Sequence, residues 1–440
     1  MSRRRVVITG VGAVSPFGFG ADALWDGLCA GRSAIGPIRA FDGSPFPSAH
    51  AAEVPDFKAR DYVPKSYRKA VKVMSRDVQL AVAAAQLAVE HAGLVTAASE
   101  DGGEPTYPGE RLGCSIGAGL VSAEVGELGV AMSRSATPEG RLDHAEWGRE
   151  GMQNLTPLWL LKTLPNMLAC HVTIVHGAKG PSNTITCAQA SGMLSVGELA
   201  RIIERGDADA GFGGSVESKV NPMGIMRLAF ADRLLPSDAV NGAEPWTLVR
   251  PYDESSSGGV LGEGGGLMIL ESLETAQGRG ATVYAEVAGF GAGHRPRGTG
   301  AAERARGLAN AIRAALRDAS VAPADVDVIV PTGASAPEHD REEAEALRVV
   351  FGDHVRAIPL MTLTPAIGDS VAGQGGLQVA AACIALAEQQ LPARLHGGSP
   401  AADLDAARAD ARRVPLRTAL VCGTGFGGQT AALVLRTMDP

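Results

Sequence analysis

Short apolar segments alternate with amphipathic helical segments along most of the chain. We expect strands at RRVVITG, RLGCSIGAG, ADAGFGGSVES and GGLMILES in the first part, and at VYAEVAGFGAG, VDVIVPTGAS and TALVCGTGFGGQTAALVL in the second. Between them, apolar residues recur three and four positions apart, which predicts helices at about 75–92, 190–205, 301–319, 341–350 and 375–390. This alternation is typical of an α/β fold with buried sheets covered by helices.

The order of these segments divides the chain into two halves, with a seam near 270–280. We expect an N-terminal half with insertions at 1–270 and a C-terminal half at 271–440. A chain of 440 residues is long enough for two such units, each with its own core. Small and polar residues at 101–107 and 397–405 predict loops.

Charge and hydropathy exclude several classes of function. A net charge of −8 argues against broad binding of nucleic acid or of anionic membranes. No apolar run approaches the roughly 18 residues of a membrane-spanning helix. The cysteines show neither CxxC pairs nor zinc-site spacing, so we expect buried, reduced thiols in a cytoplasmic protein with no metal and no cofactor. They are Cys29, Cys114, Cys170, Cys187, Cys383 and Cys422.

The segment VVITGVGAVSPFG places glycines after the first expected strand, as a dinucleotide-binding fingerprint does. Gly10 and Gly12 fit that pattern, but Ser15 stands where the third glycine is required. The match is partial, and it disfavours a nucleotide cofactor.

The segment GPSNTITCAQASGML leads into the helix expected from Ala190. A side chain directly ahead of a helix lies at the positive end of its dipole, where a thiol is acidified and an anion is stabilised. Gln189 occupies that position, and Cys187 lies two residues earlier, in the expected strand NTITC. We expect Cys187 to be a small core residue, although a nucleophilic Cys187 remains an alternative.

Four ordered motifs resemble those of the β-ketoacyl-(acyl carrier protein) synthases of the thiolase superfamily. They are VVITGVGAVSPFG, GAKGPSNTITCAQASG, RPYDESSSGGVLGEGGG and GTGFGGQT, and the similarity runs from about Arg4 to Leu435. The resemblance implies a thiolase-like α/β fold: two similar halves with mixed five-stranded sheets, sandwiched by helices in the order αβαβα. Members of this family condense an acyl thioester with a malonyl carrier protein, using a helix-start cysteine, two histidines and a lysine.

This sequence departs from the family at each of those catalytic positions. The family's cysteine, histidine and lysine patterns fall on CAQASG, TGASAPEHD and TPAIGD. The degenerate positions are Gln189 for the nucleophile, Thr332 and Asp369 for the two histidines, and Thr364 for the lysine. The resemblance also implies that Phe426 keeps the place of a gating phenylalanine, while Thr424 replaces an earlier aromatic residue.

Other polar residues are expected to be structural. We expect His339 to be a solvated loop histidine, and His171 and His176 to belong to the core or to an interface. The Gln189 carboxamide is expected to face the backbone N–H groups of residues 189 and 426, which form the oxyanion hole in active members of the family.

The substitutes cannot perform the family's chemistry. Glutamine cannot form a thioester, and an aspartate at 369 would repel a developing oxyanion. The resemblance therefore implies a chain length factor, the non-catalytic partner of a ketosynthase α subunit in a type II polyketide synthase. Three alternatives stay open: a decarboxylating (malonyl-ACP) chain-initiating ketosynthase with glutamine in place of cysteine, an atypical active synthase using Cys187, and a degenerate homodimer that binds acyl groups.

In this family the strand NTITC lies at the heterodimer interface, and the growing polyketide chain crosses it in a tunnel. GLVSAEVGELGVAM predicts a helix whose apolar face lines that tunnel or belongs to the plain core. The residues of this face are Val121, Val125, Leu128 and Met132. We expect the acyl carrier protein to dock on the α subunit because this chain is acidic. The sequences CAQASG and PLWLLKTLPNM favour a highly reducing or polyene pathway.

Overall fold

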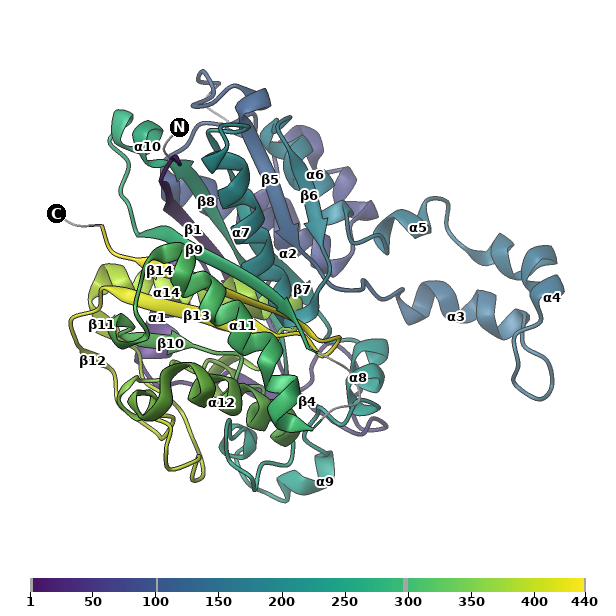
Figure 1. Cartoon of the computed structure of the whole chain (residues 1–440). Coiled ribbons are helices and arrows are strands. Elements are labelled where there is room, and N and C mark those ends of the chain that lie inside the picture. Colours follow the sequence, from purple (N-terminus) through teal and green to yellow (C-terminus); the bar gives the residue numbers. More distant parts are fainter. Residues whose placement is uncertain (1–2, 100–101, 296–299, 439–440) are drawn as a thin grey trace.

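The computed structural model describes residues 3–99, 102–295 and 300–438 (Figure 1). Nine strands lie side by side in one continuous twisted array. Their order across it is β6 (Ser182–Ile185), β5 (Leu112–Gly117), β7 (Ala210–Ser218), β8 (Leu261–Ser272), β1 (Val6–Ser15), β9 (Ala285–His294), β14 (Gln429–Arg436), β13 (Thr418–Thr424) and β10 (Val328–Val330).

The array consists of two mixed sheets that meet at β1 and β9. These strands share only the pairs Val7–Glu286 and Ile8–Ala285. The N-terminal sheet has five strands. In the C-terminal sheet four strands are regular, and the fifth position is held by a single bridge from Ile329 to Leu360.

Helices fill three layers around the two sheets. α7 (Ser191–Glu204) and α14 (Ala372–Glu388) lie between the sheets, and their apolar residues share one core cluster with strands of both. α2 (Arg76–Ala92) and α6 (Met167–His176) cover the outer face of the N-terminal sheet. α11 (Ala301–Ala319) and α12 (Pro337–Phe351) cover that of the C-terminal sheet. The predicted thiolase-like αβαβα fold is thus confirmed.

The glycines of the first motif serve helix packing. Gly10 and Gly12 lie within β1 rather than in a turn after it. A Cβ atom on Gly12 would lie 2.0 Å from the carbonyl oxygen of Ala84 in α2, and one on Gly10 would lie 2.5 Å from that of Ala88. The bare backbone therefore lets α2 lie directly on β1, which accounts for the motif without a nucleotide.

The helix boundaries follow local signals in the sequence. α2 begins after Ser75, whose side chain accepts a hydrogen bond from the Val78 backbone N–H, and ends at Gly93 with φ 64°. α12 begins at Pro337, four residues before the expected start, because proline is favoured in the first helical turn. The segments 102–107 and 397–405 form loops as predicted, and residue 101 lies outside the described residues.

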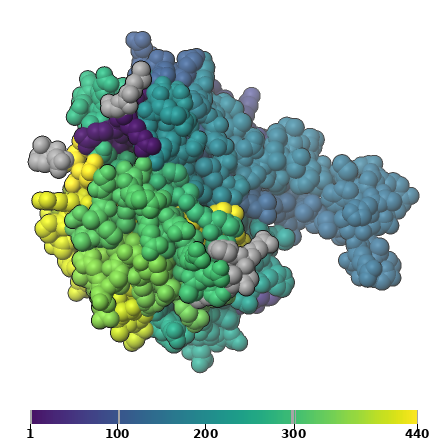
Figure 2. Space-filling view, viewed as in Figure 1, coloured from purple at the N-terminus to yellow at the C-terminus, as the bar shows by residue number. Residues whose placement is uncertain are grey.

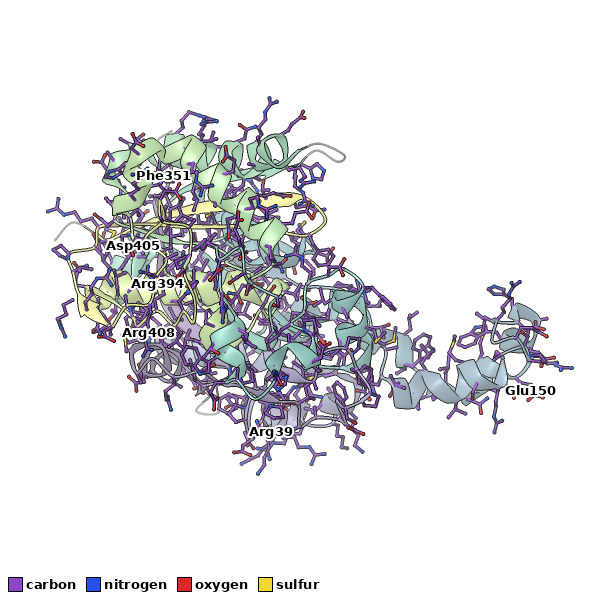
Figure 3. The ribbon with its side chains drawn as sticks, turned by 90° about the horizontal axis from the view of Figure 1, so that it is seen from below. Arg39, Glu150, Phe351, Arg394, Asp405 and Arg408 are labelled. Atoms are coloured by element: carbon purple, nitrogen blue, oxygen red, sulfur yellow. The ribbon has the colours of Figure 1, made fainter. Side chains whose placement is uncertain are left out.

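Residues 119–166, hereafter the arm, extend from the body between β5 and α6 (Figures 1 and 2). The arm contains α3 (Val125–Arg134), α4 (His144–Arg149) and α5 (Trp159–Lys162). Glu150 marks its far end in the view from below (Figure 3). The segment PLWLLKTLPNM contains α5 and reaches the start of α6. The helical backbone is interrupted between these two helices, around Pro165.

The remaining elements are short connections around the two sheets. They are α1 (Ala21–Cys29), α8 (Pro222–Ala229), α9 (Ser237–Val240), α10 (Leu273–Gly278), α13 (Thr364–Ile367), β2 (Gly18–Phe19), β3 (Ile35–Pro37), β4 (His50–Ala52), β11 (Gln390–Leu391) and β12 (Arg412–Arg413). None of the helices built by the described residues has the length and hydropathy of a membrane span.

Candidate functional site

Gln189 lies in a sharp turn immediately before the central helix α7. The turn is the short 3-10 helix Ala188–Ala190. Ala188 has φ 48°, a left-handed conformation that is unusual for a residue with a side chain. The turn places the Gln189 side chain in the protein interior, where it is 1% exposed.

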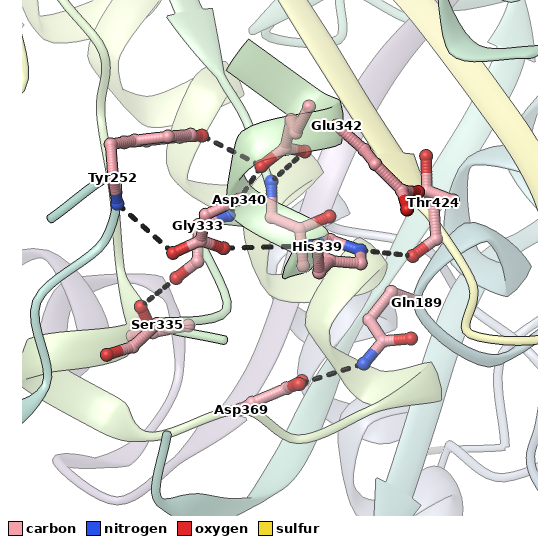
Figure 4. A network of polar contacts seen from close by, with 12 residues as sticks. Gln189, Tyr252, Gly333, Ser335, His339, Asp340, Glu342, Asp369 and Thr424 are labelled. Carbon is pink, nitrogen blue, oxygen red and sulfur yellow. Dashed lines mark hydrogen bonds and ion pairs between the residues drawn. The ribbon is translucent and has the colours of Figure 1, made fainter. Parts of the chain in front are cut away.

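The Gln189 carboxamide is bonded to the side chain of Asp369 (Figure 4). Its Nε2 donates a hydrogen bond to Asp369 Oδ2 at 2.8 Å, while Asp369 Oδ1 accepts one from the Val371 backbone N–H at 2.8 Å. Gln189 Oε1 is buried and has no hydrogen-bond partner among the described residues. The expectation that the carboxamide faces the N–H groups of residues 189 and 426 is therefore wrong, because the carboxylate of Asp369 attracts the amide donor.

Asp369 is held in position by a strained loop between α13 and α14. Gly368 has φ 68°, and Val371 has φ 53°, which is rare for a β-branched residue. The Gly262 backbone N–H donates to Asp369 O at 2.9 Å, and the Asp369 backbone N–H donates to Val260 O at 2.8 Å. These bonds fix the loop against the start of β8, so the carboxylate has a defined direction.

Thr332 and Thr364 are both fully buried. Thr332 belongs to the loop that follows β10, and Thr364 contacts that loop. The Thr332 backbone N–H donates to Glu343 Oε1 at 3.0 Å, and its Oγ1 has no partner in the described ranges. The Thr364 hydroxyl donates to Gly333 O. At the position where the resemblance implies a lysine, Thr364 therefore binds backbone and reaches no other side chain within the described residues.

His339 was expected to be a solvated loop residue, and this expectation is wrong. The residue lies in the first turn of α12 and is 5% exposed. Its Nε2 donates a hydrogen bond to Thr424 O at 2.9 Å (Figure 4). The early start at Pro337 turns this residue inward, so a helix signal misplaced by four residues caused the error.

The glycine-rich loop after β13 carries Thr424 and Phe426. The Thr424 side chain is buried, whereas Phe426 is 40% exposed. Arg295 Nη2 donates to Phe426 O at 3.2 Å, and the Arg233 guanidinium carbon lies 5.9 Å from the Phe426 ring centroid. Two arginines thus contact this loop, whose Phe426 lines a cavity of about 340 Å³.

Arg233 is a basic residue that acts electrostatically on Asp369 and that the sequence did not predict. Burial lowers the pKa of Arg233, and the charges of Asp369, Asp340 and Glu342 act in the opposite direction. Its Nη1 atom is enclosed and lacks a hydrogen-bond partner in the described part of the chain. A lone arginine after a short helix carries no sequence signal for this role.

Cys187 lies between β6 and the turn, not within the strand, and is half-buried rather than in the core. It lines a cavity of about 340 Å³ together with Ala188, Leu228 and Phe426. Burial raises the pKa of the Cys187 thiol, which disfavours the reactive thiolate.

The other thiols and the two remaining candidate histidines are structural. Cys114, Cys383 and Cys422 are buried and free, but Cys29 is only partly buried and Cys170 is exposed on α6, contrary to the expectation of buried thiols. His171 and His176 are buried in the same helix, as expected. Tyr67 Oη lies 2.7 Å from His171 Nδ1, and burial lowers the pKa of His176 to about 3.

The four residues predicted to share one helix face are separated. Val121 precedes α3 and lies in the buried core of the N-terminal half. Val125 and Met132 are 52% and 41% exposed, and Leu128 is half-buried. Val125, Leu128 and Met132 belong to α3, whereas Val121 does not, because the helix starts at Val125.

The paired sheets, the two central helices and the pocket ahead of α7 define a thiolase-like α/β protein. The family model of the β-ketoacyl synthase N-terminal domain matches residues 3–276, and that of the C-terminal domain matches residues 284–397. The chain belongs to the β-ketoacyl synthase family.

Curated relatives cover the whole chain. The chain is 31% identical over 439 residues to 3-oxoacyl-[acyl-carrier-protein] synthase 2 of Staphylococcus aureus (strain COL), with 99% of each chain covered. It is 33% identical over 438 residues to the synthase of the same name from Coxiella burnetii (strain RSA 493 / Nine Mile phase I), again with 99% of each covered.

Solved structures of the same architecture include a ketosynthase/chain length factor and a ketosynthase complex. The ishigamide ketosynthase/chain length factor is similar with a TM-score of 0.82 and 28% identity, over 100% of both chains. A type II PKS acyl-carrier protein in complex with its ketosynthase bound to the hexaketide (AntDE:AntF) gives a TM-score of 0.83 at 24% identity over 100% of both chains, which shows the fold alone.

Proposed function

We propose that this chain is a chain length factor, which pairs with a ketosynthase α subunit of a type II polyketide synthase. It shapes the interface tunnel that sets polyketide chain length and performs no chemistry alone. The observation that carries this proposal is the hydrogen bond from Gln189 to Asp369, in the pocket where active members hold a cysteine and a histidine. The departures at CAQASG and PLWLLKTLPNM support a highly reducing or polyene pathway.

The pocket lacks the groups that acyl transfer and decarboxylation need. A carboxamide nitrogen is not a nucleophile, so Gln189 cannot accept an acyl group. Both reactions develop negative charge on an oxygen, and the carboxylate of Asp369 would raise the energy of that charge. Thr332 offers one hydroxyl where active members use an imidazole. This arrangement disfavours a decarboxylating ketosynthase.

Cys187 is a poor replacement nucleophile. Its thiol pKa is raised by burial, and no hydrogen bond to its sulfur is formed within the described residues. Without a neighbouring base the thiolate is scarce at neutral pH. The cavity beside Cys187 supports the binding of an apolar chain better than attack on one.

The arm carries an apolar surface that supports a partner subunit. Eight of the thirteen large apolar side chains that are exposed in the described ranges lie in it. They are Leu120, Val125, Val130, Met132, Leu142, Met152, Leu158 and Leu160. Such concentration on one projection is typical of a protein–protein interface. The neighbouring strand β6 pairs with β5 on one side only, and its residues Ser182 and Asn183 are exposed.

The tunnel wall is proposed on α3. Val125, Leu128 and Met132 present apolar side chains at the root of the arm, next to the proposed interface. Each buried methylene of a growing chain gains about 0.8 kcal/mol until the chain meets the end wall. Beyond that point overpacking costs about 1–3 kcal/mol, so the volume of these side chains would limit product length.

A basic surface supports docking of a carrier protein on this chain as well as on its partner. Six exposed basic residues lie within residues 58–72, and none has an ion-pair partner in the described part of the chain. They are Lys58, Arg60, Lys65, Arg68, Lys69 and Lys72. Although the chain is acidic overall, this local charge would attract an acidic carrier protein. The relatives named above act with an acyl-carrier-protein by name.

Copurification and acyl transfer test the proposal together. Co-expressed with its ketosynthase α subunit, the chain should form a stable heterodimer that extends malonyl units, and the α subunit alone should not. The purified chain alone should take up no acyl group from an acyl carrier protein and release no carbon dioxide from a malonyl carrier. Acylation of the lone chain, or a homodimer that refuses the α subunit, would overturn the assignment.

A further inference from the structure

Two enclosed polar atoms face each other in the first turn of α12. His339 Nδ1 and Asp340 Oδ1 lie 3.7 Å apart, and neither has a hydrogen-bond partner among the described residues. The two residues are 5% and 2% exposed, so both atoms are shielded from bulk solvent. Buried polar atoms are nearly always paired, so this pair is suited to bind a third group.

The hydrogen bond to Thr424 fixes the ring tautomer. A backbone carbonyl oxygen only accepts, so His339 Nε2 carries the hydrogen. In the neutral ring Nδ1 then presents a lone pair to a carboxylate oxygen. Two acceptors at this separation repel each other unless a proton or a metal ion lies between them.

Glu343 supplies a third ligand atom from the same helix face. It follows His339 by four residues, which places both side chains on one side of α12. One ligand atom from each of His339, Asp340 and Glu343 lies within 4.8 Å of the others. Tyr252 Oη donates to Glu343 Oε2 at 2.8 Å, and Gly333 N–H donates to it at 2.9 Å, which orients the carboxylate.

Within the described residues Asp340 and Glu343 also lack a direct ion pair with an arginine or lysine, although the charge of Asp340 acts on the buried Arg233. Glu342 is paired with Arg295 and Arg304. Asp340 and Glu343 are both at most 2% exposed. Two buried carboxylates without a cation are strongly disfavoured.

We propose that His339 Nδ1, Asp340 Oδ1 and a Glu343 carboxylate oxygen bind one divalent transition-metal ion of the zinc class. One nitrogen and two carboxylate oxygens form a donor set that zinc accepts, with a fourth position open to water. Two ligands on one such ion are roughly 3.5 Å apart, close to the 3.7 Å between Nδ1 and Oδ1. A cavity of about 60 Å³ lined by Asp340 and Tyr252 lies on one side of these residues.

The ion would join two walls of the pocket that contains Gln189. His339 contacts the loop of Thr424, and Glu343 binds the backbone of Thr332 and Gly333. The spacing of the cysteines predicted no metal site. The signal was present as the pattern H-D-x-x-E, which places all three ligands in the first turns of a helix.

Metal titration of the tag-free full-length chain tests this site. After chelator treatment, the chain should bind one Zn²⁺ per molecule by calorimetry, and Co²⁺ should give the visible absorption of a nitrogen–oxygen site. Asp340→Asn should weaken binding by at least about tenfold. Its carboxamide oxygen can still accept the Tyr252 N–H, and its amide can donate to His339 Nδ1, so the fold is maintained.

His339→Gln is a second variant, because glutamine can still donate to Thr424 O. The matched control is His144→Gln, which removes a histidine from α4 in the arm and should leave Zn²⁺ binding unchanged. The proposal is overturned if the stripped wild-type chain binds no Zn²⁺, or if both site variants bind it as tightly as the wild type. If the variants do not fold, the Co²⁺ spectrum of the wild type decides.

Discussion

Gln189 and Asp369, 180 positions apart in the sequence, are joined by a hydrogen bond from Nε2 to Oδ2 at 2.8 Å. The bond closes the pocket ahead of α7 against the loop that precedes α14. It involves two of the positions at which the resemblance implies catalytic groups. The bond therefore joins the two halves of the fold.

Gln189→Ala should lower the free energy of unfolding by about 1–2 kcal/mol. The variant removes a hydrogen bond to a charged acceptor and leaves Asp369 with one fewer donor. Urea unfolding of the purified chain measures the change. Gln277→Ala, at an exposed glutamine of α10, is the control and should change stability by less than about 0.5 kcal/mol. Equal effects of the two variants would show that the contact contributes nothing.

Gln189→Cys should not restore condensation. The new thiol would lie at the helix start, but Asp369 and Thr332 still provide no donor suited to the oxyanion. We expect labelling by a thiol reagent without measurable ketide formation in an assay with acyl and malonyl carrier proteins. The triple variant Gln189→Cys, Thr332→His, Asp369→His should show more product than the single variant. Product from the single variant would contradict this view of the pocket.

Leu158→Asp and Leu160→Asp should weaken the heterodimer. These side chains are 62% and 54% exposed, so the isolated chain should lose little stability. A leucine buried at an interface contributes about 1.5–3 kcal/mol, and its loss should raise the Kd by roughly 10–100-fold. Val349→Asp on α12, 44% exposed and outside the arm, is the control and should not change the Kd measured by calorimetry.

Leu128→Ala or Met132→Ala should lengthen the polyketide made by the complex. A smaller side chain enlarges the proposed tunnel, and a longer product then avoids the overpacking penalty. Mass spectrometry of the released product gives its length. Leu142→Ala, elsewhere in the arm, should leave the length unchanged. If product length is unaltered while the heterodimer remains intact, α3 does not form the tunnel wall.

His176 should make the chain less stable in mild acid. Burial lowers its pKa in the folded state to about 3, whereas the unfolded value is about 6.5. The unfolded state therefore takes up a proton first as the pH falls below about 6.5, and stability decreases until the folded state is protonated near pH 3. Between pH 6.5 and 5 the loss from this residue should be about 2 kcal/mol.

Urea unfolding at these two pH values measures the His176 effect. His176→Gln should reduce the slope of stability against pH by about one proton. His144→Gln, at a histidine of the arm, should leave the slope unchanged. A slope unaffected by the first variant would mean that the buried ring titrates normally.

The sequence predicted the fold well where one local pattern decides the structure. The helix at 301–319 and the position of Gln189 directly ahead of a buried helix follow from apolar spacing. His339 was misplaced because Pro337 moves the helix start, and one displaced turn exchanges a solvated side chain for a buried one.

Tertiary contacts account for what the sequence could not predict. The donor of the Gln189 carboxamide could face backbone or carboxylate, and the choice depends on the strained loop at Val371. Val121 was separated from α3 because a helix start cannot be placed within a long apolar stretch by spacing alone. Arg233 lies beside Gln189 and Asp369 only in the folded chain, and no sequence motif predicts that position.

The contact between Gly12 in β1 and the backbone of Ala84 in α2 has an evolutionary consequence. This contact lies on the outer face of the N-terminal sheet, between elements that do not carry Gln189. A duplicated gene could therefore lose its nucleophile and histidines while this contact was inherited intact. Division of labour between two descendants of one enzyme would then require changes in only a few pocket residues and in the surface that each presents to the other.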